Sequence, residues 1–362
     1  MLVKRVCLLL FLLCALSGCT GNTAPETPKA TAEEVAAGKA LAAENAVVSA
    51  DATGRVTSLD LRKATVSADL LLKLKSLTSL QAINLADTAL DDALLAELVK
   101  VAPQAANLDL RGCSLSDAAM TEVGRLTGLK VLRLSGKNGK TTVADDGMKP
   151  LAALKSLKVL ALDNLWVGKP GIEHLAGLTE LEELYLAETL VDDETVGLIA
   201  KYPKLKKLRL SRTSVGDAAL AELKNCRFLE ELDFSENSVI TDVGMESLGA
   251  ITSLKKLNLW RVQISDTGAM ALAPLTNLQW LNLDNTKLSD AGLPTLKNMT
   301  QLTFLHIGST QITDVGAPAL FHLKSLKDLK ITRTALAASE PALAELKKNL
   351  PTTAIQTEYE GQ

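Results

Sequence analysis

The chain has 362 residues, of which 47% are hydrophobic and only 3% aromatic, so aliphatic side chains have to fill its core. Its formal net charge is −3. This balance leaves no basic excess to neutralise a phosphate backbone, and it argues against nucleic acid as a partner.

The N-terminus has the pattern of a targeting segment. Two basic residues precede an apolar run over residues 6–16, which is too short to cross a bilayer comfortably as a permanent helix. The Leu-Ser-Gly-Cys sequence at 16–19 resembles a bacterial lipobox. The resemblance implies a lipoprotein signal peptide over residues 1–18, cleavage before Cys19 and a lipid on the Cys19 sulfur. We therefore expect a lipid-anchored protein of the bacterial cell envelope, in the outer membrane or on a periplasm-facing membrane.

Three short segments surround the main part of the chain. Residues 19–30 are rich in Thr and Pro and predict a flexible tether. Residues 31–55 predict a helix with Thr31 as its N-cap, followed by a strand pair around the ADATGR turn, and together they would cap one end of the fold. Residues 352–362 form a short tail in which one closing strand is expected at Ala354–Gln356.

Residues 56–351 repeat one pattern about twelve times. The clearest copies occupy 253–276, 277–300 and 301–324, and they share LxxLxLxxTxL(S/T)DxGLxxLxxLx. A fixed period of this length predicts a solenoid rather than a globule with a buried pocket. The LxL core alternates as in a strand with one buried face, and the Ser/Thr-Asp pair after the turn predicts the start of a helix.

An aspartate recurs at this helix start in nine repeats. Such a row could suggest calcium sites, but each aspartate lacks companion ligands at calcium-loop spacing. The helix-capping interpretation is favoured, because a carboxylate is stabilised at a helix N-terminus. The nine residues are Asp92, Asp117, Asp145, Asp193, Asp217, Asp242, Asp266, Asp290 and Asp314.

The whole pattern resembles that of leucine-rich repeat proteins, in particular the ribonuclease-inhibitor-like and cysteine-containing subclasses. It is also similar to leucine-rich repeat lipoproteins of planctomycete-like bacteria. The resemblance implies an α/β solenoid shaped as a horseshoe, with a parallel sheet on the concave face and helices on the convex face. It also implies a protein- or ligand-binding role without catalytic residues.

The chain departs from this family at one turn position, where a hydroxyl replaces the usual asparagine. We expect these hydroxyls to bond to neighbouring turn backbone. They belong to Thr88, Thr141, Thr189, Thr213, Ser238, Thr286, Thr310 and Thr334.

The sequence offers little for catalysis. The histidines, His174, His306 and His322, lie in different repeats, and no HExxH, GxSxG or Walker motif is present. Cys113 and Cys226 take inward positions in distant repeats, too far apart to form a disulfide. We therefore predict a protein that is not an enzyme and needs no cofactor or metal.

The outward strand positions are where a ligand would bind. Repeats with Glu-Glu and Lys-Lys doublets alternate, so acidic and basic rows should interleave across the sheet. An insertion at 137–140 and a turn with Trp166 interrupt the pattern in repeats 4 and 5; both a tolerated surface loop and a binding loop fit them.

Three aromatic side chains, Trp260, Trp280 and Phe304, fall at outward strand positions in repeats 9 to 11. Trp280 and Phe304 should stack on adjacent strands, and His306 should lie beside Asn282. The stack could simply stiffen the sheet, or it could be a binding hot spot for a protein, a peptide or a sugar ring. We predict a binding module for a protein or glycan partner; the alternative is a structural envelope scaffold without a discrete ligand. The candidate binding residues are Trp260, Arg261, Trp280, Asn282, Asp284, Phe304 and His306.

Overall fold

A computed structural model describes residues 29–358. The predicted signal peptide, the lipidation site Cys19, most of the tether and the last residues of the tail lie outside the described residues. Within residues 29–358, none of the helices combines the length and the apolar character needed to cross a membrane.

The described chain alternates strands with helices. The strands are β1 (Val47–Ala50), β2 (Val56–Asp60), β3 (Ala82–Asn84), β4 (Asn107–Asp109), β5 (Val131–Ser135), β6 (Val159–Asp163), β7 (Glu183–Tyr185), β8 (Lys207–Arg209), β9 (Glu231–Asp233), β10 (Lys256–Asn258), β11 (Trp280–Asn282), β12 (Phe304–His306), β13 (Asp328–Lys330) and β14 (Ala354–Gln356).

One helical segment or more follows each strand from β2 to β13. The α-helices are α1 (Ala32–Ala43), α2 (Ala68–Leu72), α3 (Asp92–Val101), α4 (Asp117–Val123), α5 (Asp145–Leu151), α6 (Lys169–Leu175), α7 (Asp193–Ile199), α8 (Asp217–Leu223), α9 (Asp242–Gly249), α10 (Asp266–Ala271) and α11 (Glu340–Asn349). The 3₁₀ helices are η1 (Lys73–Ser76), η2 (Asp290–Asn298), η3 (Asp314–Leu320) and η4 (Leu336–Ala338).

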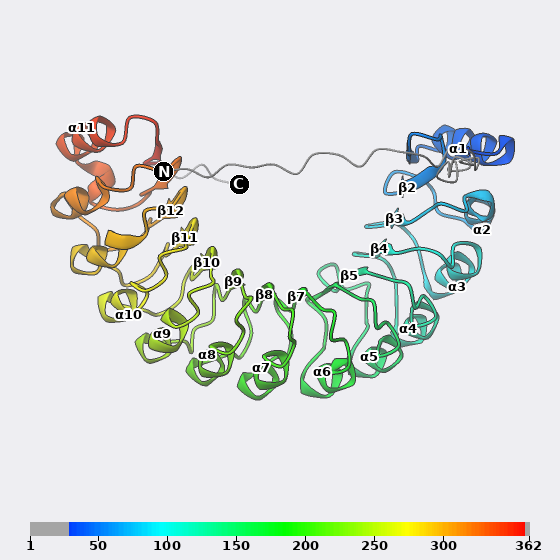
Figure 1. Cartoon of the computed structure of the whole chain (residues 1–362), viewed down its shortest axis with the longest axis horizontal. Helices are drawn as coiled ribbons and strands as arrows, with labels where there is room; N and C mark the ends of the chain where they lie inside the picture. The colour runs from blue at the N-terminus through cyan, green and yellow to red at the C-terminus, as the bar shows by residue number, and fades with distance from the viewer. Residues whose placement is uncertain (1–28, 359–362) are drawn as a thin grey trace, which may run out of the picture.

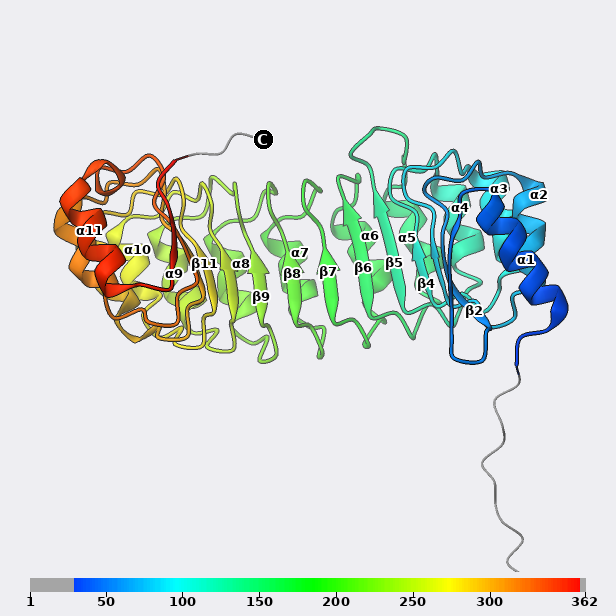
Figure 2. The same ribbon diagram turned by 90° about the horizontal axis from the view of Figure 1, so that it is seen from above.

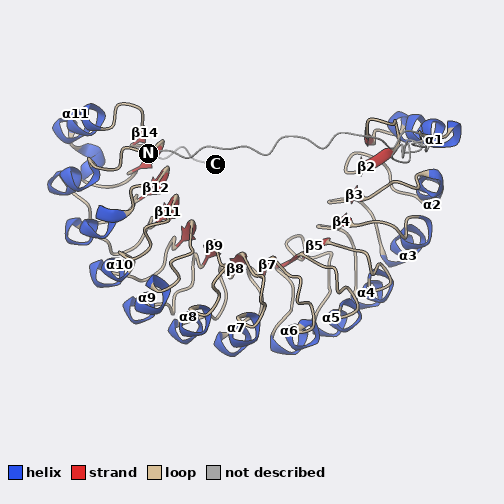
Figure 3. Cartoon of the chain, in the orientation of Figure 1, coloured by secondary structure: helices blue, strands red, loops and turns tan. Residues whose placement is uncertain are grey.

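These elements form an open arc. The strands make a single 14-stranded sheet in sequence order, in which β1 is antiparallel to β2 and the later neighbours are parallel. The sheet lines the inner side of the arc, and the helices cover the outer side (Figures 1 and 3). Seen from above, the strands stand side by side along the length of the molecule (Figure 2). The predicted α/β solenoid, with its concave sheet and convex helices, is confirmed.

The N-terminal end of the sheet is covered by α1 and β1. The Thr31 side chain accepts a hydrogen bond from the Glu34 backbone, which is the expected N-cap. Glu34 is buried, and its carboxylate accepts a hydrogen bond from the Val56 backbone at 3.1 Å. The polar contact thereby ties α1 to the first strand of the repeat region. At the other end, β14 lies where the closing strand was expected.

The core is one continuous cluster that runs from Leu41 to Leu350. In each repeat the apolar residues on both sides of an outward strand residue point inward, as Leu257 and Leu259 do around Asn258, and both of these are fully buried. Burying such a side chain contributes about 1.5–3 kcal/mol. Because each repeat shares its buried face with its neighbours, the stability comes from stacking rather than from any repeat alone.

The turn hydroxyls bond to backbone carbonyls at seven of the eight predicted positions. Thr286, for example, donates to the Leu283 carbonyl at 2.8 Å. The prediction is wrong at Ser238. The turn after β9 is one residue longer, and buried Asn237 takes the position, donating to the Leu210 carbonyl at 2.8 Å. One repeat therefore has an asparagine in place of the turn hydroxyl.

The nine recurring aspartates begin their helices, as the capping interpretation predicted. Eight of them also accept a backbone hydrogen bond from the start of the next helix. Asp242, for example, accepts from the Ser265 backbone at 2.7 Å and from the Ser265 hydroxyl at 2.5 Å. Each carboxylate thus stabilises its own helix N-terminus and fastens it to the following repeat.

The glycine of the Asp-x-Gly signature makes room for this carboxylate. A Cβ on Gly268 would overlap Asp242 Oδ1 of the preceding repeat, and it would lie 3.0 Å from Met245 Cγ. The same overlap with the preceding aspartate would occur at Gly147, Gly171, Gly244, Gly292 and Gly316. The glycine of the signature is therefore needed for close contact between neighbouring repeats, and not for the conformation of a single turn.

In repeats 10 and 11 the predicted helices are 3₁₀ helices, η2 and η3. Each has a proline as its fifth residue, Pro294 or Pro318. A proline there has no N–H to donate to the carbonyl four residues earlier, and its ring crowds that carbonyl. Pro150 comes one position later in α5, which remains α-helical.

We predict opposite effects for two glycine-to-alanine substitutions in the helices. Gly268→Ala should lower the free energy of unfolding by about 1–3 kcal/mol, because its methyl group displaces the Asp242 carboxylate. The matched control is Gly197→Ala in α7, where a Cβ would meet only the Glu222 side chain at 3.8 Å. That change should raise stability by up to about 1 kcal/mol. Denaturant unfolding followed by circular dichroism measures both, and a Gly268→Ala protein at least as stable as the wild type would contradict this account.

Candidate functional site on the concave face

The outward strand residues form two columns across the sheet. Neighbouring strands are in register, so that Lys256 pairs with Trp280 and Trp280 with Phe304. From β7 to β12 the first column is Glu183, Lys207, Glu231, Lys256, Trp280 and Phe304. The second column is Tyr185, Arg209, Asp233, Asn258, Asn282 and His306.

Charges on β7, β8 and β9 neutralise one another. Lys207 Nζ lies 3.3 Å from the Glu183 carboxylate and 3.2 Å from that of Glu231. Arg209 lies between Asp163 at 3.3 Å and Asp233 at 3.5 Å. The interleaving predicted from the doublets is confirmed. Exposed pairs of this kind contribute about 0–1 kcal/mol each, so they set the register and solubility more than the stability.

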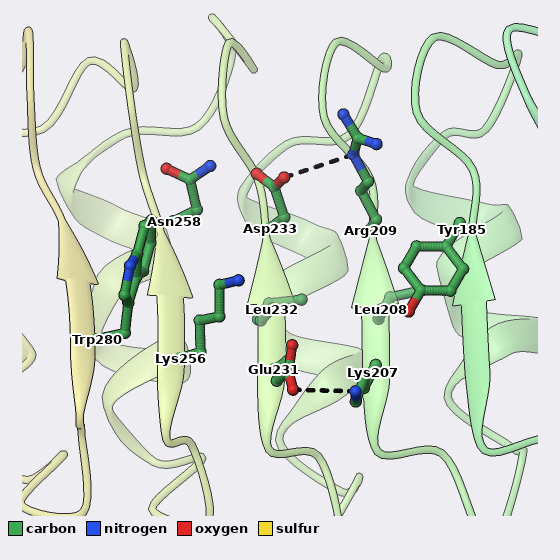
Figure 4. Close-up of a pocket in the computed structure, with 10 residues that line it drawn as sticks. All are labelled: Tyr185, Lys207, Leu208, Arg209, Glu231, Leu232, Asp233, Lys256, Asn258 and Trp280. Atoms are coloured by element: carbon green, nitrogen blue, oxygen red, sulfur yellow. Dashed lines mark ion pairs between the residues drawn. The ribbon is translucent and has the colours of Figure 1, made fainter. Parts of the chain in front are cut away.

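A hollow of ≈ 360 Å³ lies on the concave face between β7 and β11. Tyr185, Arg209 and Asp233 border one side of it, and Lys256 and Trp280 the other (Figure 4). The Tyr185 hydroxyl donates to the Glu183 carboxylate at 2.7 Å. Burial, together with this negative neighbour, raises the pKa of Tyr185, so that the phenol stays protonated. The hollow combines an aromatic wall with charged and amide groups.

Trp280 and Phe304 stack as predicted, with ring centroids 4.7 Å apart and planes within 5°. Lys256 Nζ lies 5.0 Å from the Trp280 ring centre, and Lys330 Nζ lies 5.8 Å from that of Phe304. Because these residues follow one another on β10 to β13, a lysine covers each outer face of the ring pair. The ring edges, rather than the ring faces, are left for a ligand.

Trp260 and Arg261 lie apart from this stack. The sequence placed Trp260 at a strand position, but β10 ends at Asn258 and Trp260 lies in the following turn. The Arg261 guanidinium stacks on the Trp260 ring at 4.8 Å and pairs with Glu236 at 3.2 Å. The predicted site residues therefore form two groups, and these two stand at the rim.

His306 lies beside Asn282, as predicted, and meets the Phe304 ring edge-on with centroids 6.5 Å apart. Its Nε2 is 3.7 Å from Asp284 Oδ1. Both atoms are buried, and neither has a hydrogen-bond partner among the described residues. Burial lowers the pKa of His306; the nearby Asp284 charge raises it, and the Lys330 charge lowers it. The imidazole is therefore held mainly in its neutral form.

We predict that two substitutions move the pKa of His306 in opposite directions. Asp284→Asn should lower it further because an attractive charge is lost, and Lys330→Ala should raise it because a repulsive charge is lost. Histidine resonances followed by NMR across a pH titration measure both shifts. In the wild type, His306 binds more protons in the unfolded state than in the folded state. Its contribution to the free energy of unfolding should therefore fall as the pH drops from 6.5 through the lowered pKa. An increase in the pKa of the Asp284→Asn variant would contradict this assignment.

The insertion at 137–140 borders a second hollow, of ≈ 520 Å³, at the edge of the concave face. Its residues are exposed, and Asn138 Nδ2 donates to the Gly112 carbonyl at 3.0 Å. Arg62 and Arg111, which also line this hollow, pair with Asp60 and Asp109. The loop is thus anchored by its own polar contacts, and both interpretations of the insertion stay open.

The two inner cysteines are free and buried. Burial raises the pKa of Cys113, and it raises that of Cys226 to about 11. Both thiols therefore stay protonated near neutral pH, which does not suit them as nucleophiles.

Several residues around the hollow were missed from the sequence, namely Tyr185, Arg209, Asp233, Lys256 and Asn258. Their outward columns were visible in the repeat alignment. The charged doublets and the few aromatic residues of repeats 9 to 11 were more conspicuous in the sequence than these positions. That repeats 6 to 10 border one hollow depends on the curvature of the sheet, which the sequence does not show.

A family model and one solved structure agree with this fold. A leucine-rich repeat family model matches residues 225–249, 250–273 and 298–321. The crystal structure of an internalin (inlF) from Listeria monocytogenes is similar with a TM-score of 0.62 and 20% identity, over 94% of this chain and 100% of that one. Internalin C2 of the same species matches with a TM-score of 0.45 and 24% identity, over 59% and 84% of the two chains.

A chain of the PEPR1–AtPEP1 crystal structure matches with a TM-score of 0.49 and 18% identity, over 86% of this chain and 50% of that one. No curated protein sequence matches this chain. Three segments of the chain thus match the leucine-rich repeat model, and the fold is that of a leucine-rich repeat solenoid.

Proposed function

We propose that this chain is a lipid-anchored protein of the bacterial cell envelope that binds another protein through its concave face. The observation that carries the binding role is the surface between β7 and β12, where aromatic, amide and charged side chains surround one hollow. Aromatic anchors inside a polar rim are typical of binding hot spots.

A protein suits this surface better than a glycan. A sugar ring binds by lying flat on an aromatic face, and the outer faces of the Trp280–Phe304 pair are covered by Lys256 and Lys330. A glycan would have to displace one of the lysines. A polypeptide can instead reach the ring edges and bond to the flanking amides and charges.

The alternative is a structural envelope scaffold without a discrete ligand. The paired charges of β7 to β9 favour it, because ion pairs such as Lys207 with Glu183 and Glu231 satisfy the face internally. The lipid anchor is common to both proposals and is supported by the lipobox-like sequence at 16–19.

We predict that the concave aromatic stack is required for partner capture. Trp280→Ala should reduce the partner captured from envelope extract on the order of tenfold, because a hot-spot aromatic is lost. The matched control is Phe228→Ala, which removes another aromatic side chain that is 62% exposed and lies in the loop between α8 and β9. Quantitative mass spectrometry of the captured proteins measures both, with circular dichroism to check the fold. Equal capture by the wild type and Trp280→Ala would favour the scaffold alternative.

We also predict that Cys19 carries the lipid. Cys19→Ala should accumulate as an unprocessed precursor without incorporated lipid label, because cleavage follows modification of this sulfur in lipoproteins of this type. Cys14→Ala, a change inside the apolar run, is the control and should be processed and labelled normally. One acyl chain gives only marginal membrane attachment, so the processed protein should carry more than one. Normal labelling of the Cys19→Ala protein would exclude the anchor.

A further inference from the structure

Charge is divided unevenly along the concave face. On and directly before β7 to β9, the basic residues Lys206, Lys207 and Arg209 each pair with a carboxylate. On and directly before β10 to β13 stand four lysines and only one aspartate, Asp328. The lysines are Lys255, Lys256, Lys327 and Lys330.

Most of these lysines lack an acidic partner. Lys255 pairs with Glu230 at 2.8 Å, but Lys256, Lys327 and Lys330 make no ion pair within residues 29–358. A net positive surface has therefore formed on a chain whose overall charge is −3. An excess of one sign on one patch attracts a partner of the opposite sign.

The amides between these lysines also present donors. Asn258 Oδ1 accepts from the Trp260 backbone at 3.3 Å, and Asn282 Oδ1 accepts from the Asp284 backbone at 2.9 Å. These bonds fix the orientation of each amide, so its Nδ2 group is the free end. Neither Nδ2 has an acceptor in the described part of the chain, and the two residues are neighbours in register. The surface thus offers hydrogen-bond donors that no acceptor within residues 29–358 takes up.

We propose that this donor surface, formed by Lys256, Asn258, Asn282 and Lys330 around the Trp280–Phe304 stack, binds an extended acidic segment of the partner protein. The inference rests on the proposed protein-binding function and specifies its partner. Carboxylates pair with the two ammonium groups, and peptide carbonyls accept from the two amides. The ring edges contact the apolar parts of the segment between them.

The geometry sets the spacing of the two carboxylates. Three distances link the two ammonium groups: from Lys256 to the Trp280 ring, between the two rings, and from the Phe304 ring to Lys330. Their sum is an upper limit, so the ammonium groups lie less than about 16 Å apart. Crossing the three strand steps from β10 to β13 requires about 14 Å. An extended peptide advances about 3.4 Å per residue, so acidic residues about four positions apart match the two lysines.

The test is a fluorescence-anisotropy titration of the full-length protein with a labelled peptide containing Glu-Ser-Thr-Ser-Glu. Lys256→Ala and Lys330→Ala should each weaken binding about threefold, and the double variant about tenfold, since exposed pairs are individually weak and distant pairs add. Lys158→Ala is the control, because its partner Glu182 keeps a second pair with Lys206. It should leave the affinity unchanged, and added salt should weaken the wild-type binding.

Two further probes separate spacing and chemistry from net charge. The Gln-Ser-Thr-Ser-Gln peptide should bind about tenfold more weakly, and Glu-Glu-Ser-Thr-Ser, which has the same charge, about threefold more weakly. Equal affinity for the glutamine peptide, full binding by the double variant, or equal binding of an oligonucleotide would overturn the inference. If Trp280→Ala reduces partner capture as predicted while the acidic peptide fails to bind, the proposed function stands and this inference alone is wrong.

Discussion

The rest of this structure depends on the hydrogen bonds between an aspartate at the start of one helix and the backbone at the start of the next. Eight such carboxylates cross from repeat to repeat. They hold the convex ends of neighbouring repeats at a fixed offset, and the signature glycine allows the close approach that this requires. The leucine core then stacks in the same register, so that equivalent side chains of successive strands form straight columns across the inner face.

Those columns turn a one-dimensional sequence pattern into a surface. A residue at an outward position always lies beside the residue at the same position of the next repeat, on a strand about 4.8 Å away. Alternating Glu and Lys doublets thus become mutually neutral rows on β7 to β9. Where the alternation stops, Trp280 and Phe304 stack. The ammonium groups of Lys256 and Lys330 lie over these rings and pair with no carboxylate within residues 29–358. The two ends of the concave face therefore differ: the charges on β7 to β9 pair with one another, and the lysines beside the Trp280–Phe304 stack do not.

His306 shows how such a face can hold a polar group that is only partly compensated. Its Nε2 and the Asp284 carboxylate oxygen face each other at 3.7 Å without a partner among the described residues. Groups in such an environment respond to their neighbours more strongly than groups in water do, because burial removes the solvent screening. The protonation of His306 is therefore linked to Lys330, the residue that also covers the Phe304 ring.

The sequence by itself determined the solenoid, the inner strands, the helix starts at the nine aspartates and the Trp280–Phe304 neighbourhood, because a fixed repeat converts position in the chain directly into position on the fold. It failed at Ser238, where the turn is one residue longer and Asn237 takes the position of the turn hydroxyl, and at Trp260, which lies beyond the end of its strand. Only the tertiary structure decided which carboxylate each lysine reaches, that lysines cover the aromatic faces, and that residues from Tyr185 to Trp280 border one hollow. These features depend on side-chain directions and on the curvature summed over several repeats, and neither is contained in the period of the pattern.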